Sequence, residues 1–341
     1  MKIVVYLGTG GVGKTSLAAA TALAQARQGR RCLVLTTDPA HRLRTALGLG
    51  ADALEQRVTL DPPAPAELWG AMLDVRSTLD DAVRMYGKPA VIDKVLAHPI
   101  YATIASSLAG MSELMAVERI DQLIRRGFDN IVVDTAPSRH ALEFLDKPMF
   151  FAGLSDSNWV KLIGRTYRFA AATPFGFFSR GSFELYSRVE ALLGARLVTQ
   201  VLEFYSLFVS IAEGYSERAR QTVALLKNPD VTEFRIVSTP QKAVSDTSYF
   251  LAQLGARGFP VDAVCVNRVW TEAAGPERAS GLEGELLDWY EAVRESQERE
   301  IRLLKNTLGG AGTKIIPVPE LEVDVGGIES LERIAASARL D

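Results

Sequence analysis

The residues Gly8-Thr9-Gly10-Gly11-Val12-Gly13-Lys14-Thr15 decide the fold, because they fill the phosphate-binding pattern Gly-x-x-x-x-Gly-Lys-Thr. Glycines let successive backbone N–H groups turn toward an anion where a Cβ would clash. A short apolar run at 2–7 precedes the loop, and an alanine-rich helical stretch at 16–28 follows it. This order directs the positive end of a helix at the same anion. We therefore predict a nucleotide site in which Lys14 neutralises the β- and γ-phosphates and the Thr15 hydroxyl is a ligand of Mg²⁺.

Beyond this loop, short β-branched runs alternate with helical patterns along the chain. The runs lie at 31–37, 130–135, 233–239, 261–269 and 313–318. Helical patterns separate most of them, for example at 245–256 and 283–305. Continuous apolar strands that alternate with helices are typical of a parallel sheet covered on both faces. We therefore predict an α/β fold, a P-loop NTPase with a mostly parallel sheet flanked by helices and an inserted helical subdomain.

Two stretches, about 74–126 and 150–227, carry helical patterning without a convincing strand. We predict that residues 1–341 form a single P-loop domain and that these two stretches form the helical subdomain within it. Residues 149–215 hold 14 of the 27 aromatic side chains of the chain. Two interpretations of this enrichment stay open. The aromatic side chains either fill the core of the helical subdomain or line an apolar groove for a client helix.

Two aspartates follow apolar runs at positions that suit phosphate chemistry. Asp134 ends the run 131–134, and Asp38 follows the run 32–35. Ligands bind at the carboxyl edge of open parallel sheets, which is where both carboxylates are expected. Asp134 would hold the water shell of Mg²⁺, and Asp38 would orient and polarise the attacking water. The alternative is that each is an ordinary aspartate in a turn or at the start of a helix. The presence of two aspartates beside one phosphate loop disfavours this alternative.

The composition indicates which kinds of partner and which cell compartment to expect. The formal net charge is −3 and no long basic run occurs, so nucleic acid is not expected as a partner. Cys32 and Cys265 each lie in an apolar run, which predicts buried, unpaired thiols and a reducing compartment. The first apolar run is too short for a signal peptide. The most apolar helical stretch, 198–212, is interrupted by Glu203 and falls short of the ~20 residues that span a bilayer. We expect a cytoplasmic protein without stable membrane insertion.

At these motifs the sequence resembles the family of the arsenical-pump ATPases and the ATPases that deliver tail-anchored membrane proteins. The matching segments are the phosphate loop, 37–41 as a first switch, 134–140 as a second switch, 259–268, and the tail 316–331. The two switches together are the more specific part of the match. The resemblance covers most of the chain and is weakest over about 50–110 and 150–225.

The resemblance implies ATP or ADP as ligand, with Mg²⁺. The phosphates would contact the loop and the start of the next helix, namely Gly8, Thr9, Gly10, Gly11, Val12, Gly13, Lys14, Thr15 and Ser16, together with Asp134. Asp38 would be the water-activating residue and Asn267 would read adenine. Gln241 lies near the usual position of a nucleotide-contacting glutamate, and the segment around Pro317 would pack on the base. The second switch, with Pro137, would transmit the state of the γ-phosphate to the helical subdomain.

Three departures from the family pattern matter. Thr9 stands where the family usually carries a lysine that reaches across a dimer to the phosphates of the partner. Because a cation supplied in trans can accelerate phosphoryl transfer by orders of magnitude, we expect slow hydrolysis or a partner chain that donates the lysine. The cysteines that clasp zinc or bind arsenite are missing, so arsenite transport is not expected. The usual aspartate near 110–113 is missing as well. A single phosphate loop implies a homodimer, or a heterodimer with a paralogous ATPase.

The sequence leaves functions of different classes open. The leading hypothesis is an ATP-driven targeting factor, in which nucleotide binding closes a dimer and an apolar groove accepts a client helix. The alternative is a nucleotide-gated regulatory switch of the Min/Par type that recruits a protein partner with little or no turnover. An anion-pump motor is a third class, which the missing thiols disfavour.

Overall fold

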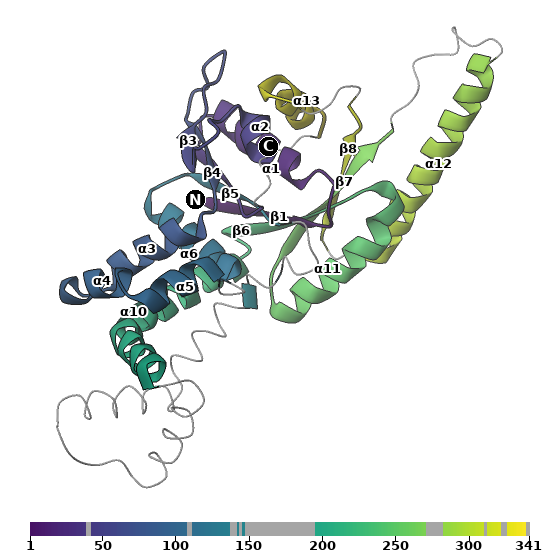
Figure 1. Ribbon diagram of the computed structural model, residues 1–341. Coiled ribbons are helices and arrows are strands. Elements are labelled where there is room, and N and C mark those ends of the chain that lie inside the picture. Colours follow the sequence, from purple (N-terminus) through teal and green to yellow (C-terminus); the bar gives the residue numbers. More distant parts are fainter. Residues whose placement is uncertain are drawn as a thin grey trace, which may run out of the picture. The chain divides into compact units, whose positions relative to one another are not determined.

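The computed structural model describes residues 1–38, 42–107, 111–136, 142, 145–146, 195–270, 282–309, 312–321 and 326–338. The chain divides into two compact units. The first unit contains Met1–Leu73, Leu123–Leu142 and Ala224–Asp341, and the second contains Asp74–Gln122 and Glu143–Val223. Figure 1 labels the helices and strands of both units.

The first unit is built on one sheet of eight strands in the order β3-β4-β2-β5-β1-β6-β7-β8. The strands are β1 (Lys2–Gly8), β2 (Cys32–Thr36), β3 (Glu55–Arg57), β4 (Leu68–Met72), β5 (Asn130–Asp134), β6 (Thr232–Ser238), β7 (Val261–Val269) and β8 (Lys314–Pro319). Every pairing is parallel except that between β3 and β4. The predicted α/β fold with a mostly parallel sheet is confirmed.

The centre of this sheet is apolar on both faces. The side chains of Ile3, Val4 and Val5 in β1 are 0–1% exposed, which explains why the strand is a continuous apolar run rather than an alternating one. Helix α1 (Lys14–Arg27) buries a series of alanines, and their small side chains let the helix lie close to the sheet. Helices α1 and α13 (Ile328–Ala338) cover one face of the sheet, and α11 (Ala243–Arg257) covers the other (Figure 1).

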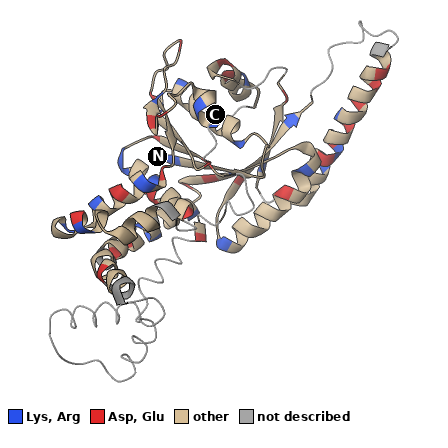
Figure 2. Ribbon diagram, viewed as in Figure 1, with Lys and Arg blue, Asp and Glu red and all other residues tan. Residues whose placement is uncertain are grey.

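Three further elements belong to the first unit. They are the short helix α2 (Arg42–Leu47), the 3-10 turn η2 (Pro240–Lys242) and the long helix α12 (Leu282–Leu308). Acidic and basic side chains alternate along α12 (Figure 2), where Arg294 pairs with Glu291 at 2.8 Å and also with Glu298. Such pairs between residues three or four apart are typical of a solvated helix face.

In the second unit every described element is helical. Its helices are α3 (Val75–Tyr86), α4 (Pro89–Leu96), α5 (Pro99–Ser107), α6 (Met111–Arg125) and α10 (Ala195–Lys227), the last two of which continue past its boundary. Polar side chains tie these helices together inside the unit. The Thr222 hydroxyl donates to Asp121 Oδ1 at 3.1 Å, and the Tyr86 hydroxyl donates to the Glu118 carboxylate at 3.2 Å. Buried polar groups that are paired in this way avoid the cost of desolvation without a partner.

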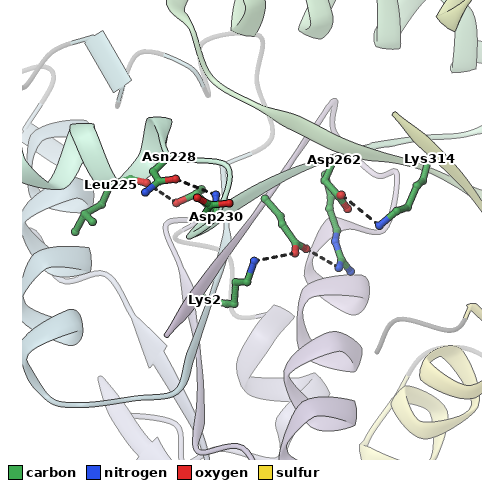
Figure 3. A network of polar contacts seen from close by, with 9 residues as sticks. Lys2, Leu225, Asn228, Asp230, Asp262 and Lys314 are labelled. Carbon is green, nitrogen blue, oxygen red and sulfur yellow. Dashed lines mark hydrogen bonds and ion pairs between the residues drawn. The ribbon is translucent and has the colours of Figure 1, made fainter. Parts of the chain in front are cut away.

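The amino ends of four neighbouring strands carry ion pairs. Lys2 Nζ lies 3.9 Å from Glu233 Oε1, and Lys314 Nζ lies 3.4 Å from Asp262 Oδ1 (Figure 3). Each of these side chains belongs to the first or second residue of its strand, in β1, β6, β7 and β8. In parallel strands the carboxyl ends all meet at the opposite edge of the sheet, so this charged edge lies away from the phosphate loop.

Candidate nucleotide site

The phosphate loop connects the end of β1 to the start of α1, and two of its glycines are required by close approach. A Cβ on Gly8 would lie 2.3 Å from the carbonyl oxygen of Val237 in β6. Gly13 has φ 95°, and a Cβ there would lie 2.2 Å from Asn267 Nδ2. This amide donates to the carbonyl oxygen of Val12 at 2.8 Å. Because Gly8 and Gly13 have no side chain, β6 and β7 can pack directly against the loop.

This packing makes Gly13→Ala a sharp test of the loop. The substitution places a Cβ in a left-handed conformation and displaces the amide of Asn267, so we expect the free energy of unfolding to fall by about 2–4 kcal/mol. The matched control is Gly255→Ala in α11, where a Cβ would meet no atom within 4 Å. That variant should gain about 0.5–1 kcal/mol, because alanine is the better helix former. Urea unfolding of both variants measures the difference, and equal stabilities would contradict the described loop packing.

Lys14 places its cation against the loop. The residue is 6% exposed, and its Nζ donates to the carbonyl oxygens of Gly8 at 3.0 Å and Thr9 at 2.9 Å. Burial lowers the pKa of Lys14, whereas the nearby carboxylates of Asp134 and Asp38 act in the opposite direction. The ammonium group is thus held at the mouth of the loop, where an anion would meet it.

Asp134 ends β5 and is the most buried carboxylate of the site, with 0% exposure. Its Oδ2 atom accepts hydrogen bonds from Thr15 Oγ1 at 2.7 Å and from Thr36 Oγ1 at 2.9 Å. Within the described residues, its Oδ1 atom has no hydrogen-bond partner. Burial raises the pKa of Asp134 from 3.8 to about 6, although the two hydroxyls and Lys14 favour the ionised form. A buried carboxylate oxygen without a partner, beside a threonine hydroxyl, fits the oxygen ligands that Mg²⁺ prefers.

Asp38 follows the end of β2 on the same edge of the sheet, where Thr36 and Asp134 are register partners. Its backbone N–H donates to Thr36 Oγ1 at 3.1 Å. The residue lines a cavity of about 470 Å³, a size that suits a small-molecule ligand. The described residues that line it are Gly11, Gly13, Lys14, Thr15, Ser16, Asp38, Arg42, Thr45, Ala46 and Arg268.

The structure brings some of the sequence-predicted residues together and leaves others apart. The phosphate loop, Asp38 and Asp134 lie at one edge of the sheet. Asn267 supports the loop through Val12, and within the described part of the chain it is not among the residues that line the cavity. The same holds for Gln241, which is exposed on η2, and for Pro317, which is exposed on β8. Pro137 lies outside the described residues, as does most of both switch segments.

Other residues of the site were not predicted. Arg42 and Arg268 line the cavity, and Thr36 binds Asp134. The Thr9 hydroxyl donates to Asp246 Oδ2 at 3.0 Å, and the same oxygen accepts from Ser238 Oγ at 3.3 Å. The two arginines could have been found by their position beside residues that were singled out, since Arg42 directly follows the segment 37–41 and Arg268 ends the segment 259–268. Nothing in the sequence pattern points to Asp246, which reaches the loop from α11 only in the fold.

The buried lysine in the phosphate loop and the two carboxylates at the carboxyl edge of a parallel sheet define a P-loop nucleotide hydrolase. A model of the family described as anion-transporting ATPase matches residues 1–168. Relatives align along nearly the whole chain. The chain belongs to the anion-transporting ATPase family and is an ATPase, which confirms the resemblance seen in the motifs.

Three relatives illustrate the match. "Putative arsenical pump-driving ATPase 1" of Aquifex aeolicus is 26% identical over 98% of this chain and 78% of its own length. ATPase ARSA1 of Chlamydomonas reinhardtii is 26% identical over 97% of this chain and 42% of its own length, so this chain spans less than half of that protein. ATPase GET3C of Arabidopsis thaliana is 24% identical over 95% of this chain and 79% of its own length.

Cys32 and Cys265 are both free and buried, and burial raises the pKa of both thiols to about 12. Buried thiols of high pKa are inert rather than reactive. Within the described ranges, no helix combines the length and the apolar character that a membrane crossing requires.

Proposed function

We propose that this ATPase binds Mg²⁺ with ATP and uses its nucleotide state to control the binding or delivery of a hydrophobic client, as a targeting factor. The observation that carries the nucleotide part is the arrangement around Asp134. Its carboxylate accepts from the Thr15 hydroxyl at 2.7 Å, and its other oxygen is buried without a hydrogen-bond partner in the part of the chain that the structure describes. A buried carboxylate with a spare oxygen beside a phosphate loop is best explained by a divalent cation bound together with the nucleotide.

Each residue of the site then has a defined task. The backbone N–H groups of the loop bind phosphate oxygens, and Lys14 neutralises their charge. Thr15 and Asp134 would hold Mg²⁺, which when bound neutralises charge on the phosphates. The Asp38 carboxylate accepts a hydrogen bond from the attacking water and orients it. Thr9 contributes a hydroxyl and no charge, so we expect turnover to be slow.

The client part of the proposal rests on composition and on the helical second unit. Residues 149–215 are rich in aromatic side chains, and most of them lie outside the described residues. One that is described, Phe204, is 6% exposed and stacks on Phe208 with ring centroids 5.3 Å apart, so it belongs to the core of its unit. Arsenite is not the client that we propose, because both thiols are buried in the sheet. With one phosphate loop per chain, we propose a homodimer or a heterodimer with a paralogous ATPase as the working unit.

A second candidate is a nucleotide-gated switch that recruits a protein partner with little turnover. The contact between Thr9 and Asp246 favours it, because the hydroxyl is already engaged at 3.0 Å and brings no cation to the phosphates. Such a switch needs no groove for an apolar helix. The two functions therefore differ in what ATP makes the protein bind.

The test measures ATP affinity and the binding of a fluorescent, leucine-rich helical peptide by wild type, Lys14→Ala and Lys314→Ala. Lys314 lies at the opposite edge of the sheet and is the matched control (Figure 3). We expect Lys14→Ala to weaken ATP binding about 10- to 100-fold, because it removes a charge-assisted contact, and Lys314→Ala to leave it unchanged.

For a targeting factor, the affinity for the peptide should differ between the ATP and ADP states in wild type and lose this difference in Lys14→Ala. Equal, negligible peptide binding in both states, with an ATP-dependent change in oligomer mass, would favour the switch instead. Unchanged ATP affinity in Lys14→Ala would contradict the nucleotide site itself.

A further inference from the structure

Arg268 has a left-handed backbone conformation, which is unusual for a residue other than glycine. Its φ is 63°, and it is the only non-glycine residue with positive φ in the described part of the chain. It lies in β7 where the pairing with β8 shifts register between Asn267 and Val269. Residues other than glycine adopt this conformation at a cost that persists where the surroundings require it, often at functional sites. Here the irregular strand exposes the arginine and places it in the lining of the nucleotide cavity.

Arg42 is a second arginine in the lining of the same cavity. It is the first residue of α2 and is exposed. Burial is the main cause that lowers the pKa of Lys14, and the positive charge of Arg42 acts in the same direction, so the two cations lie close enough to repel each other. Among the described residues, neither Arg42 nor Arg268 has a hydrogen-bond or ion-pair partner that would account for its position.

The two arginines approach the loop from different parts of the sheet. Arg42 follows β2 along the chain and Arg268 belongs to β7, and these strands lie on opposite sides of β1 in the sheet order. Together with Lys14 they put three cations around one cavity of about 470 Å³. Asp38 adds one carboxylate to the same lining, so the cations still outnumber the anions, and a polyanionic ligand offsets the excess positive charge. Arginine also offers a planar fork of donors that matches phosphate oxygens.

We propose that Arg42 and Arg268 are phosphate-binding residues of this ATPase, which bind the triphosphate of ATP in cis from both sides of the loop. The inference rests on the proposed nucleotide site and says which residues of this chain supply its positive charge. Position 9 cannot provide a cation, because a threonine side chain carries no charge, and its hydroxyl is bound to Asp246. The two arginines provide positive charge from the same chain, so ATP binding does not depend on a lysine from a partner.

The experiment measures two affinities by isothermal titration calorimetry in the presence of Mg²⁺. One is the affinity for the non-hydrolysable analogue AMP-PNP, and the other is the affinity for ADP. The variants are Arg42→Gln, Arg268→Gln, Arg268→Gly and Lys14→Ala, with Arg30→Gln as a control that removes one exposed charge outside the cavity lining. We expect the two glutamine variants to weaken AMP-PNP binding at least about tenfold each and ADP binding less, because a contact to a charged group is lost. Arg30→Gln should stay within about twofold of wild type, since an exposed, distant charge is screened by salt.

Arg268→Gly separates a binding role from a structural one. Glycine accepts the positive φ without strain, so we expect the melting temperature to rise by about 2 °C while AMP-PNP affinity falls as in Arg268→Gln. A higher melting temperature with unchanged affinity overturns the role of Arg268. This inference alone is overturned if Arg42→Gln and Arg268→Gln bind AMP-PNP as tightly as Arg30→Gln does while Lys14→Ala loses binding. Unchanged binding in Lys14→Ala as well would overturn the proposed nucleotide site.

Discussion

Asp38→Asn should lower the rate of ATP hydrolysis by about 10²- to 10⁴-fold, which is the usual contribution of a positioned acid–base group. The carboxylate follows β2 and lines the cavity that also contains Lys14 and Thr15. Asparagine keeps the size of the side chain and its backbone contact to Thr36, but an amide does not attract a proton from water. The loss should therefore appear in kcat. The affinity for ATP should change by less than about threefold, because the phosphates are held by the loop and its cations.

Single-turnover hydrolysis and equilibrium binding of ATP separate these two quantities. The matched control is Asp52→Asn, which removes a carboxylate from an exposed position outside the described cavity lining. Its turnover should equal that of wild type. If Asp38→Asn retained more than about a tenth of the wild-type rate, Asp38 would not be the water-activating residue, and the assignment would have to move to another group.

The sheet of this protein could be predicted from the sequence wherever a strand is buried on both faces. The predicted run 261–269 coincides with β7, and the run 31–37 contains β2 (Cys32–Thr36). Strands β3 (Glu55–Arg57) and β4 (Leu68–Met72) were missed. The first has three polar residues and pairs only with β4 at the end of the sheet, and the second contains a glycine. A short strand that is held by its neighbour rather than by its own apolar pattern gives little local signal.

The candidate site could be predicted to the extent that its residues belong to one motif or follow a strand. Lys14, Thr15, Asp38 and Asp134 meet these conditions, because the carboxyl ends of parallel strands share one edge of the sheet. Asp246 does not, since its contact with Thr9 joins residues 237 positions apart. Arg268 ends a segment that was singled out, but its place in the cavity lining depends on a local shift in strand register, which no pattern of residue types specifies. The extent of the helical subdomain stays a prediction, because residues 147–194 lie outside the described part of the chain.

Asp134→Asn should make the nucleotide-free protein more stable at neutral pH while it removes Mg²⁺-dependent hydrolysis. Burial raises the pKa of this carboxyl from 3.8 to about 6, so the folded protein binds a proton more tightly than the unfolded chain does. The difference corresponds to about 3 kcal/mol, by which the ionised group lowers the free energy of unfolding above about pH 6. As the pH falls from about 6 to about 4, the group becomes protonated in the folded state and this unfavourable contribution disappears.

Asparagine carries no charge at any of these pH values, so its contribution should not change with pH. Its oxygen can still accept from the hydroxyls of Thr15 and Thr36, and its NH2 group takes the place of the unpartnered Oδ1 atom. An unpartnered buried donor costs about 1–2 kcal/mol, which leaves a net gain of about 1–2 kcal/mol at pH 8. Urea unfolding of wild type and Asp134→Asn near pH 5 and pH 8 measures this, with Asp52→Asn as the exposed control.

The gain in Asp134→Asn should shrink or change sign near pH 5, because there the wild-type carboxyl is already largely protonated. A variant that is less stable than wild type at both pH values would mean that the buried carboxylate is compensated within the protein itself. The expected result instead means that Asp134 is held in an unfavourable, ionised state until a cation arrives with the nucleotide. Mg²⁺ with ATP should then stabilise wild type strongly and Asp134→Asn weakly, which ties the buried charge to ligand binding.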